Sequence, residues 1–516
     1  MTGLILALAV LAVTVYGPFY NNPLVHEDIF YLYHYREVLH MPLAELTSPL
    51  SSVPGTSAYF RPIFWFFESA IYHFFGLNPI AYHAAGLGLH LINATLVSIL
   101  AFLVSRNRTH AALAALFFFL SYLHSEPLLF RIAQVHILGG FWFLLSLIAY
   151  IHYRQSERRW AFLVSVVLFY VAVFSNQATI GLVAILLLYD MVYPRPDSSL
   201  GRTFVLSCRR LFAFLPAIGL SLALSLELAK GKYSIGINLI RNVITILSYP
   251  WYYFGFPGGV TILYKQSSSV FAFVMSLLNA PVAGTIIARL LCAAGTVALF
   301  VWRVLRGTKL ERFGCLFFLL AFIPFSLSGG IVNWYFYIPI IGFSLVISYW
   351  FLQFWGWTAS SFSSFPRRQM AVRFASILVL TGWVIYQVSY IGQMGRDYRA
   401  AGMIYSQVVH DLEQLGPFDG DKPLFVKGLP RIHGYARTIE KKLLQYAFRV
   451  HLKKPTLLVH WVDQTATFPH RFPKARFLIY RNQQLVEVSP SEESSGLSDR
   501  PGLSSPELGS GEAGHL

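Results

Sequence analysis

Residues 3–29 read GLILALAVLAVTVYGPFYNNPLVHEDI, an apolar run that ends at two adjacent acids. The apolar part, residues 3–20, is long enough to cross a hydrocarbon core about 30 Å thick. It has no basic segment in front of it and no small-x-small cleavage site before Tyr20, so we interpret it as a retained first helix and not as a signal peptide. Glu27 and Asp28 then lie just beyond a membrane span, where carboxylates are costly to desolvate and usually mark a site.

The whole chain has the composition of a membrane protein. Of its 516 residues, 55% are hydrophobic and 12% are charged, and the mean hydropathy is +0.54. Repeated apolar runs predict a polytopic α-helical protein with about 11 membrane-spanning helices. The expected spans are residues 3–20, 79–104, 111–123, 135–153, 160–175, 178–193, 211–227, 282–302, 313–328, 331–353 and 374–391.

The distribution of Lys and Arg between the loops predicts the topology. If the N-terminus is cytoplasmic, the loops expected inside carry 16 Lys and Arg residues, and the longer loops expected outside carry 7. Because short cytoplasmic loops retain Lys and Arg, this bias places the acidic segment and the C-terminus outside. The inside loops are 105–110, 154–159, 194–210, 303–312 and 354–373, and the outside loops are 21–62, 124–134, 176–177, 228–270 and 329–330.

Two apolar segments are expected to lie along the outer interface as juxtamembrane helices. Residues 62–76 are short and rich in aromatic residues, and they contain Glu68 and His73. Counting them as a span would put the Arg-rich loops on the wrong side. Residues 236–256 are interrupted by proline.

The composition changes from about residue 395. Acidic residues become frequent there, and apolar stretches at residues 423–426 and 456–459 indicate strands. From about residue 489 the chain is rich in Ser, Gly, Pro and Glu, a composition typical of disorder. The sequence therefore predicts a transmembrane domain over 1–394, a small extracytoplasmic α/β domain over 395–488 and a disordered tail over 489–516.

The net charge of +16 does not indicate a nucleic-acid partner. Most basic residues lie in short loops between spans, and there is no basic helix or aromatic-basic platform. Cys208, Cys292 and Cys315 have no metal-ligand spacing and predict no disulfide framework.

The outer loops collect the residues that could carry chemistry. A lipid-linked phosphate donor requires cations that stabilise the leaving phosphate, and an acceptor hydroxyl requires a carboxylate base. The chain has no nucleotide-binding glycine loop, which fits a donor that is activated as a lipid phosphate. The candidate carboxylates are Glu27, Asp28 and Glu126, and the candidate donor-phosphate or substrate-binding residues are Arg61, His83, His124, Arg131, Arg241 and Lys265.

Structural roles for the same residues remain open at this point. Glu27 and Asp28 are equally explained as solvated acids or as a cap for the following helix. His83 and His90 lie seven residues apart on one face of a predicted span, and such histidines are more often packed and hydrogen-bonded than ligands. No pair of histidines on one helix supports a metal site, although the sequence leaves a divalent metal open.

Several motifs, in the right order over about residues 20–350, resemble the GT-C superfamily of polyprenyl-phosphate-sugar glycosyltransferases. The likeness is greatest to the O-mannosyltransferase (PMT-like) branch that carries TPR repeats, although no TPR repeats follow here. The matching segments are Val25-His26-Glu27-Asp28-Ile29, Tyr59-Phe60-Arg61-Pro62, Gly76-Leu77-Asn78-Pro79-Ile80-Ala81-Tyr82-His83, Gly86-Leu87-Gly88-Leu89-His90, His124-Ser125-Glu126-Pro127-Leu128 and Tyr335-Phe336-Tyr337-Ile338-Pro339-Ile340-Ile341-Gly342-Phe343.

The resemblance implies a GT-C-like fold with a catalytic acid in the first outer loop and juxtamembrane helices beside it. It also implies a multi-pass protein of the bacterial inner membrane. The chain departs from the family pattern at charged positions, which here are neutral or altered: His136, Asn176, Gln177 and Trp334, with a Glu-Asp pair in place of two aspartates.

We therefore expect a membrane glycosyltransferase that moves a hexosyl or pentosyl group, with inversion, from a polyprenyl-phosphate sugar to a protein, lipid or glycan acceptor. Asp28 would be the general base, with Glu27 adjacent and with Glu126 and His124 in the same cavity. A different class of function is a catalytically degenerate scaffold or a lipid or glycan transporter. The altered charged positions favour this second class, but transporters usually contain internal repeats, and none is found here.

Overall fold

The computed structural model describes most of the helical part of the chain and the strands near its end. The described residues are 2–35, 38–40, 60–195, 198–229, 238–252, 280–326, 332–361, 366–418, 422–430, 432–433, 436–439, 444, 448–449, 457–462 and 475–489. Lys265 and residues 490–516 of the expected disordered tail lie outside this set.

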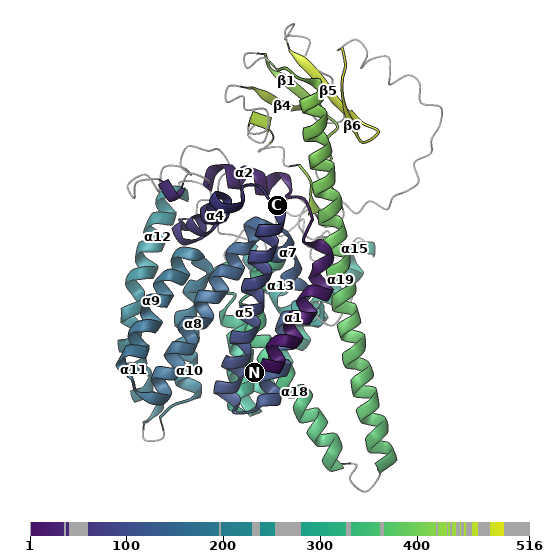
Figure 1. Cartoon of the computed structure of the whole chain (residues 1–516). Helices are drawn as coiled ribbons and strands as arrows, with labels where there is room; N and C mark the ends of the chain where they lie inside the picture. Colours follow the sequence, from purple (N-terminus) through teal and green to yellow (C-terminus); the bar gives the residue numbers. More distant parts are fainter. Residues whose placement is uncertain are drawn as a thin grey trace.

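Helices, many of them long and apolar, form the body of the molecule (Figure 1). In the first half they are α1 (Thr2–Tyr16), α2 (His26–Tyr35), α4 (Pro62–Phe75), α5 (Pro79–Ser105), α6 (Arg108–Phe119), α7 (Ser125–Leu129), α8 (Val135–Ser156), α9 (Arg159–Ser175), α10 (Leu182–Val192), α11 (Leu200–Leu211) and α12 (Leu215–Ala229). In the second half they are α13 (Asn238–Tyr252), α15 (Ala280–Arg306), α16 (Lys309–Leu320), α17 (Ile323–Ser326), α18 (Pro339–Ser361) and α19 (Pro366–Leu415). Short 3-10 helices join several of them: η1 (Gly17–Phe19), η2 (Val38–His40), η4 (Tyr122–His124), η5 (Arg131–Gln134), η6 (Gln177–Gly181), η7 (Phe212–Phe214) and η9 (Asn333–Phe336).

The chain is a multi-pass membrane protein by the length and apolarity of these helices. Among the described residues, six helices are long and apolar enough to cross a membrane, or seven if the bent pair Arg108–Phe119 and Tyr122–Leu129 is one span. The expected count of about 11 is therefore not confirmed. Several expected spans, such as α9 and the helical stretch Gln177–Val192, are shorter apolar helices that lie beside the long ones.

The two expected juxtamembrane segments are both helical. In the first segment, residues 62–75 form α4, which has 14 residues and is not one of the six candidate spans. In Figure 1 it lies beside α2 at the end of the bundle nearest the strands. The second segment contains α13, which continues through Pro250 and packs against α15.

The C-terminal region is a small sheet carried by α19. Its strand order is β4-β1-β5-β6, in which β1 (Leu424–Lys427) is parallel to β4 (Val459–Val462) and β5 (Arg476–Arg481), and β6 (Gln484–Glu487) is antiparallel to β5. A separate pair joins β2 (Ile432–His433) and β3 (Ala436–Arg437). The helix α19 continues through residue 395, where the composition changes, and ends at Leu415.

The sheet and the acidic end of the bundle share one hydrophobic core. Ile29 and Leu32 of α2 and Tyr82 of α5 belong to the same buried cluster as residues of α19 and of the sheet. The contributing side chains from α19 and the sheet region are Tyr405, Val408, Val409, Leu412, Leu424, Val426, Val459 and Leu478. Figure 1 shows α19 running along the bundle to the strands. This packing holds the C-terminal region against the segment that carries Glu27 and Asp28.

Candidate functional site

The two acids of the first loop lie in the first turn of α2. The helix begins at His26, so Glu27 and Asp28 are inside it and not in front of it. Asp28 Oδ2 accepts a hydrogen bond of 3.3 Å from the backbone N–H of Val25, the contact that an acid in the first turn makes when it caps its own helix. The capping alternative is thus correct in part. Both side chains are buried, with Asp28 only 1% exposed, so neither is a solvated surface acid.

A third acid joins them from α4. Glu68 forms an ion pair with Arg131 of η5, and both side chains are fully buried. The Arg131 guanidinium also lies over the Tyr82 ring, 4.8 Å from its centroid, in a cation–π contact. Because α2 contacts both α4 and η5, the three acids and Arg131 are gathered at one end of the bundle. We call Glu27, Asp28, Glu68 and Arg131 the acidic site.

Burial sets the protonation of Asp28. Removal from water raises the pKa of Asp28 to about 7, and Glu27 adds to this effect because it carries a like charge. Arg131 and the backbone amides of Val25 and Ile132 oppose the shift. A carboxyl group whose pKa lies near neutrality can accept and release a proton, which is the property of a general base.

One glycine allows η5 to pack closely on α5 at the acidic site. Gln134 of η5 donates a hydrogen bond of 3.1 Å to the backbone carbonyl of Tyr82. Its side-chain amide lies so close to Gly86 that a Cβ there would come within 2.6 Å of Nε2. Gly86 therefore lets η5 approach α5 and keeps Arg131 over Tyr82.

A second polar group lies around Arg61, just before α4. Arg61 Nε donates to Gln177 Oε1 at 2.9 Å, and Gln177 Nε2 donates to the Phe60 carbonyl at 2.6 Å. The neighbouring Asn176 side chain lies 3.0 Å from His136 Nδ1. His136, Asn176 and Gln177, three of the four positions at which the sequence departs from the GT-C pattern, thus make hydrogen-bonded contacts near Arg61. The fourth, Trp334, packs its ring 5.8 Å from that of Phe130.

His124 lies in a third group, inside the bundle. Its ring is 5.0 Å from that of His90 and 4.6 Å from that of Tyr337. Asn93 donates to the Tyr337 hydroxyl at 2.9 Å, which leaves that hydroxyl to donate to His90 Nδ1 at 2.8 Å. His90 Nε2 then donates to the Phe119 carbonyl at 3.1 Å. This network fits a packed, hydrogen-bonded His90, as the structural alternative expected.

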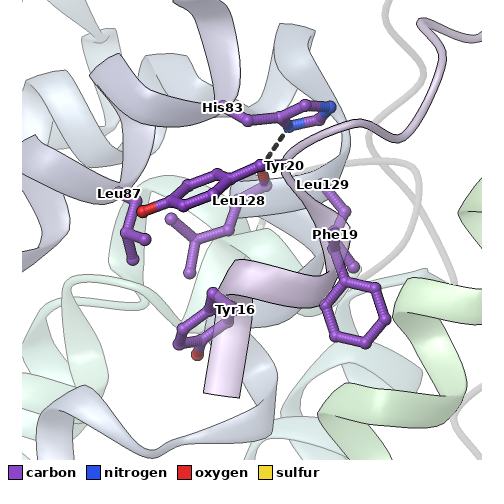
Figure 2. Close-up of a pocket in the computed structure, with 7 residues that line it drawn as sticks. All are labelled: Tyr16, Phe19, Tyr20, His83, Leu87, Leu128 and Leu129. Carbon is purple, nitrogen blue, oxygen red and sulfur yellow. Dashed lines mark hydrogen bonds between the residues drawn. The ribbon is translucent and has the colours of Figure 1, made fainter. Parts of the chain in front are cut away.

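His83 joins two segments of backbone beside a small pocket. Its ring nitrogens lie 3.3 Å from the Leu128 carbonyl and 3.1 Å from the Asn22 carbonyl. The ring lines this pocket, shown in Figure 2, together with side chains that are mostly apolar. The other lining residues are Tyr16, Phe19, Tyr20, Leu87, Leu128 and Leu129. These contacts give His83 a bridging role between the first loop and α7.

The remaining candidates are spread more widely. Glu126 is half-buried in α7, and Arg241 lies in α13. Within the described residues, no group of three or more His, Cys, Asp or Glu side chains is placed to hold a metal ion. The structure thus brings Asp28 and Glu27 together with Arg131. Arg61 contacts Gln177, and His124 packs against His90 and Tyr337.

Glu68, Tyr82 and Gln134 were not among the residues expected at the site. Tyr82 lies in one of the segments that resemble the family, and Gln134 lies in an expected outer loop. Glu68 is a charged residue in an otherwise apolar aromatic helix, and this was interpreted as a sign of an interfacial helix.

No protein-family model and no curated protein matches the sequence. Among solved structures, the chain is similar to ArnT from Cupriavidus metallidurans in the apo state, with 15% identity and a TM-score of 0.44 over 96% of this chain and 95% of that one. The same protein bound to undecaprenyl phosphate gives 15% identity and a TM-score of 0.45 over 95% and 98%. The oligosaccharyltransferase of Archaeoglobus fulgidus in its apo form gives 12% identity and a TM-score of 0.47 over 90% of this chain and 64% of that one.

Proposed function

We propose that the chain is an inverting membrane glycosyltransferase that moves a sugar from a polyprenyl-phosphate donor to an extracytoplasmic acceptor hydroxyl, with Asp28 as general base. The observation that carries the proposal is the buried Asp28 carboxyl group, which has a pKa of about 7 and lies in the field of Arg131. The sequence motifs shared with polyprenyl-phosphate-sugar glycosyltransferases support the same assignment.

The proposed reaction is a single displacement. The acceptor oxygen attacks the anomeric carbon of the sugar while its proton passes to Asp28. The bond between that carbon and the phosphate oxygen breaks, and the phosphate leaves on the lipid. Arg131 would stabilise the charge that develops on this phosphate. The apolar bundle around the site supplies the low-dielectric surroundings in which such stabilisation is strongest.

The test is Asp28→Asn in purified protein supplied with labelled polyprenyl-phosphate sugars and a panel of acceptors. We expect a loss of transfer of about 100-fold or more, the usual contribution of a general base. Glu157→Gln is the control, because Glu157 forms an exposed surface ion pair with Arg195. Full transfer by Asp28→Asn would rule out the base assignment.

A non-catalytic scaffold is the second candidate, and the group around Arg61 favours it. The neutral side chains of Asn176 and Gln177 stand where the family pattern has charged ones, and they contact His136 and Arg61. A scaffold of this kind would bind lipid phosphate without transferring sugar. Absence of transfer from every donor of the panel, together with retained lipid binding, would support it.

A further inference from the structure

We propose that Glu68 is an internal anion that occupies Arg131 until the phosphate of the donor replaces it. This role rests on the proposed function and deepens it, because it makes Glu68 a positioning residue for the donor. The geometry that points to it is the Glu68–Arg131 ion pair, in which both side chains are fully buried beside Asp28.

The first argument is the number of partners around Glu68. Asp190, another fully buried carboxylate, is hydrogen-bonded by Tyr150, Arg154, Ser207 and Arg210, as a fixed structural acid should be. Among the described residues, Glu68 has a single ionic partner, Arg131, and neither of its oxygens accepts a conventional hydrogen bond. An acid that is held by one contact can be displaced at lower cost than one that is held by four.

The second argument is the charge balance. The acidic site holds three carboxyl groups and one guanidinium. An ion pair that is buried adds little stability over apolar side chains of the same volume, so stability alone does not account for placing Glu68 and Arg131 in the interior. A phosphate offers Arg131 at least the negative charge of Glu68 and more acceptor oxygens in a geometry suited to a guanidinium.

The third argument is position. Arg131 stacks on Tyr82, so a group other than Glu68 also holds it in place, and it lies close enough to Asp28 to affect the ionisation of that carboxyl group. A phosphate that replaces Glu68 on Arg131 would lie next to the proposed base. Glu68 therefore reserves the anion position while no donor is bound.

The experiment measures ligand binding by purified full-length protein in detergent, with undecaprenyl phosphate and inorganic phosphate as separate probes. Glu68→Gln should bind undecaprenyl phosphate about tenfold more tightly than the wild type, since one competing charge-assisted contact is lost. Arg131→Gln should bind it more weakly. Tightening with both probes identifies the headgroup alone as the ligand, and tightening with the lipid alone identifies a lipid phosphate.

Glu311→Gln is the matched control. Glu311 is a buried acid paired with Arg303 at 3.0 Å, and Arg303 also lies over aromatic rings. Its substitution should leave phosphate binding unchanged. If Glu68→Gln is not recovered as a monodisperse protein, Glu68→Asp is tested in its place. It should also bind undecaprenyl phosphate more tightly than the wild type, by a smaller factor, because the shorter aspartate side chain holds Arg131 less well.

Unchanged or weaker lipid binding by folded Glu68 variants would overturn the inference. The proposed function can fail separately. If Asp28→Asn still transfers sugar while Glu68→Gln tightens binding, the base assignment is wrong and the role of Glu68 stands. If Asp28→Asn is inactive and Glu68→Gln does not tighten binding, the base assignment stands and the proposed role of Glu68 is wrong.

Discussion

Arg131 and Glu68 form an ion pair between η5 and α4, with both side chains fully buried. The pair links a loop between α7 and α8 to a helix more than sixty residues earlier in the chain. It lies beside the acids of α2, so the packing of these three segments decides whether the acidic site forms.

We first predict strong thermodynamic coupling within this pair. Arg131→Gln should lower the free energy of unfolding by about 3–5 kcal/mol, because it leaves the buried Glu68 carboxylate without a counter-ion. Glu68→Gln should cost less, because Asp28 and Glu27 remain near Arg131. The double variant should be much less destabilised than the sum. Thermal unfolding of the wild type, the two single variants and the double variant in detergent, followed by tryptophan fluorescence, gives the four stabilities of this double-mutant cycle. Additive effects would mean that the two side chains do not interact.

The second prediction concerns pH. The pKa of Asp28 is about 7 in the folded protein and near 3.8 in the unfolded chain, so the folded state holds the extra proton between these values. Stability contributed by Asp28 should therefore fall as the pH rises from about 4 to 7, and Asp28→Asn should lose this dependence. Transfer activity should change in the opposite direction, rising through about pH 7 as the base ionises. An activity profile that is flat between pH 6 and 8 would contradict the role of Asp28.

The third prediction uses two glycines on one helix. At Gly86 a Cβ would come within 2.6 Å of the Gln134 side chain, whereas at Gly88 nothing lies within 4 Å. Gly86→Ala should push Gln134 away from the Tyr82 carbonyl and cost about 1–3 kcal/mol. Gly88→Ala should be neutral or slightly stabilising, because alanine is the better helix former. Equal melting temperatures for the two variants would show that the close contact between residue 86 and Gln134 does not affect stability.

The fourth prediction concerns the network inside the bundle. Tyr337→Phe removes the hydroxyl that accepts from Asn93 and donates to His90. Two buried polar groups then lose a partner, so we expect a loss of about 1–3 kcal/mol. Tyr349→Phe is the control. Tyr349 lies in α18, which begins at Pro339 just after Tyr337, and its ring makes an edge contact with His110. An equal loss in both variants would point to general damage to α18 and not to the network.

The sequence predicted helix positions well where local signals end a helix. The span expected at 79–104 is α5, Pro79–Ser105, because Asn78 caps its first turn and Arg106 adopts a left-handed conformation after its last. It predicted less well where tertiary packing decides. The helix α19 runs through the composition change at residue 395, and Gly395 and Gly402 pack closely on Phe19 and Pro23.

The site shows the same division. Asp28 and Arg131 could be predicted from their residue types and from the loops that carry them. Glu68 could not, because its partner is distant in the sequence and its ionic contact depends on how α4 packs against η5. The packing of His124 against Tyr337 likewise depends on segments that are distant in the sequence, which no local pattern encodes.

The last prediction concerns topology. Leu77 and Asn107 flank α5 at its two ends, and Leu77 is 40% exposed. The Lys and Arg bias places Leu77 outside, together with the acidic site, and Asn107 in the cytoplasm. In a variant whose three cysteines are replaced by alanine, Leu77→Cys should react with an impermeant maleimide in intact cells. Asn107→Cys should react only after permeabilisation. The reverse pattern would put the acidic site in the cytoplasm, where an extracytoplasmic acceptor cannot reach Asp28.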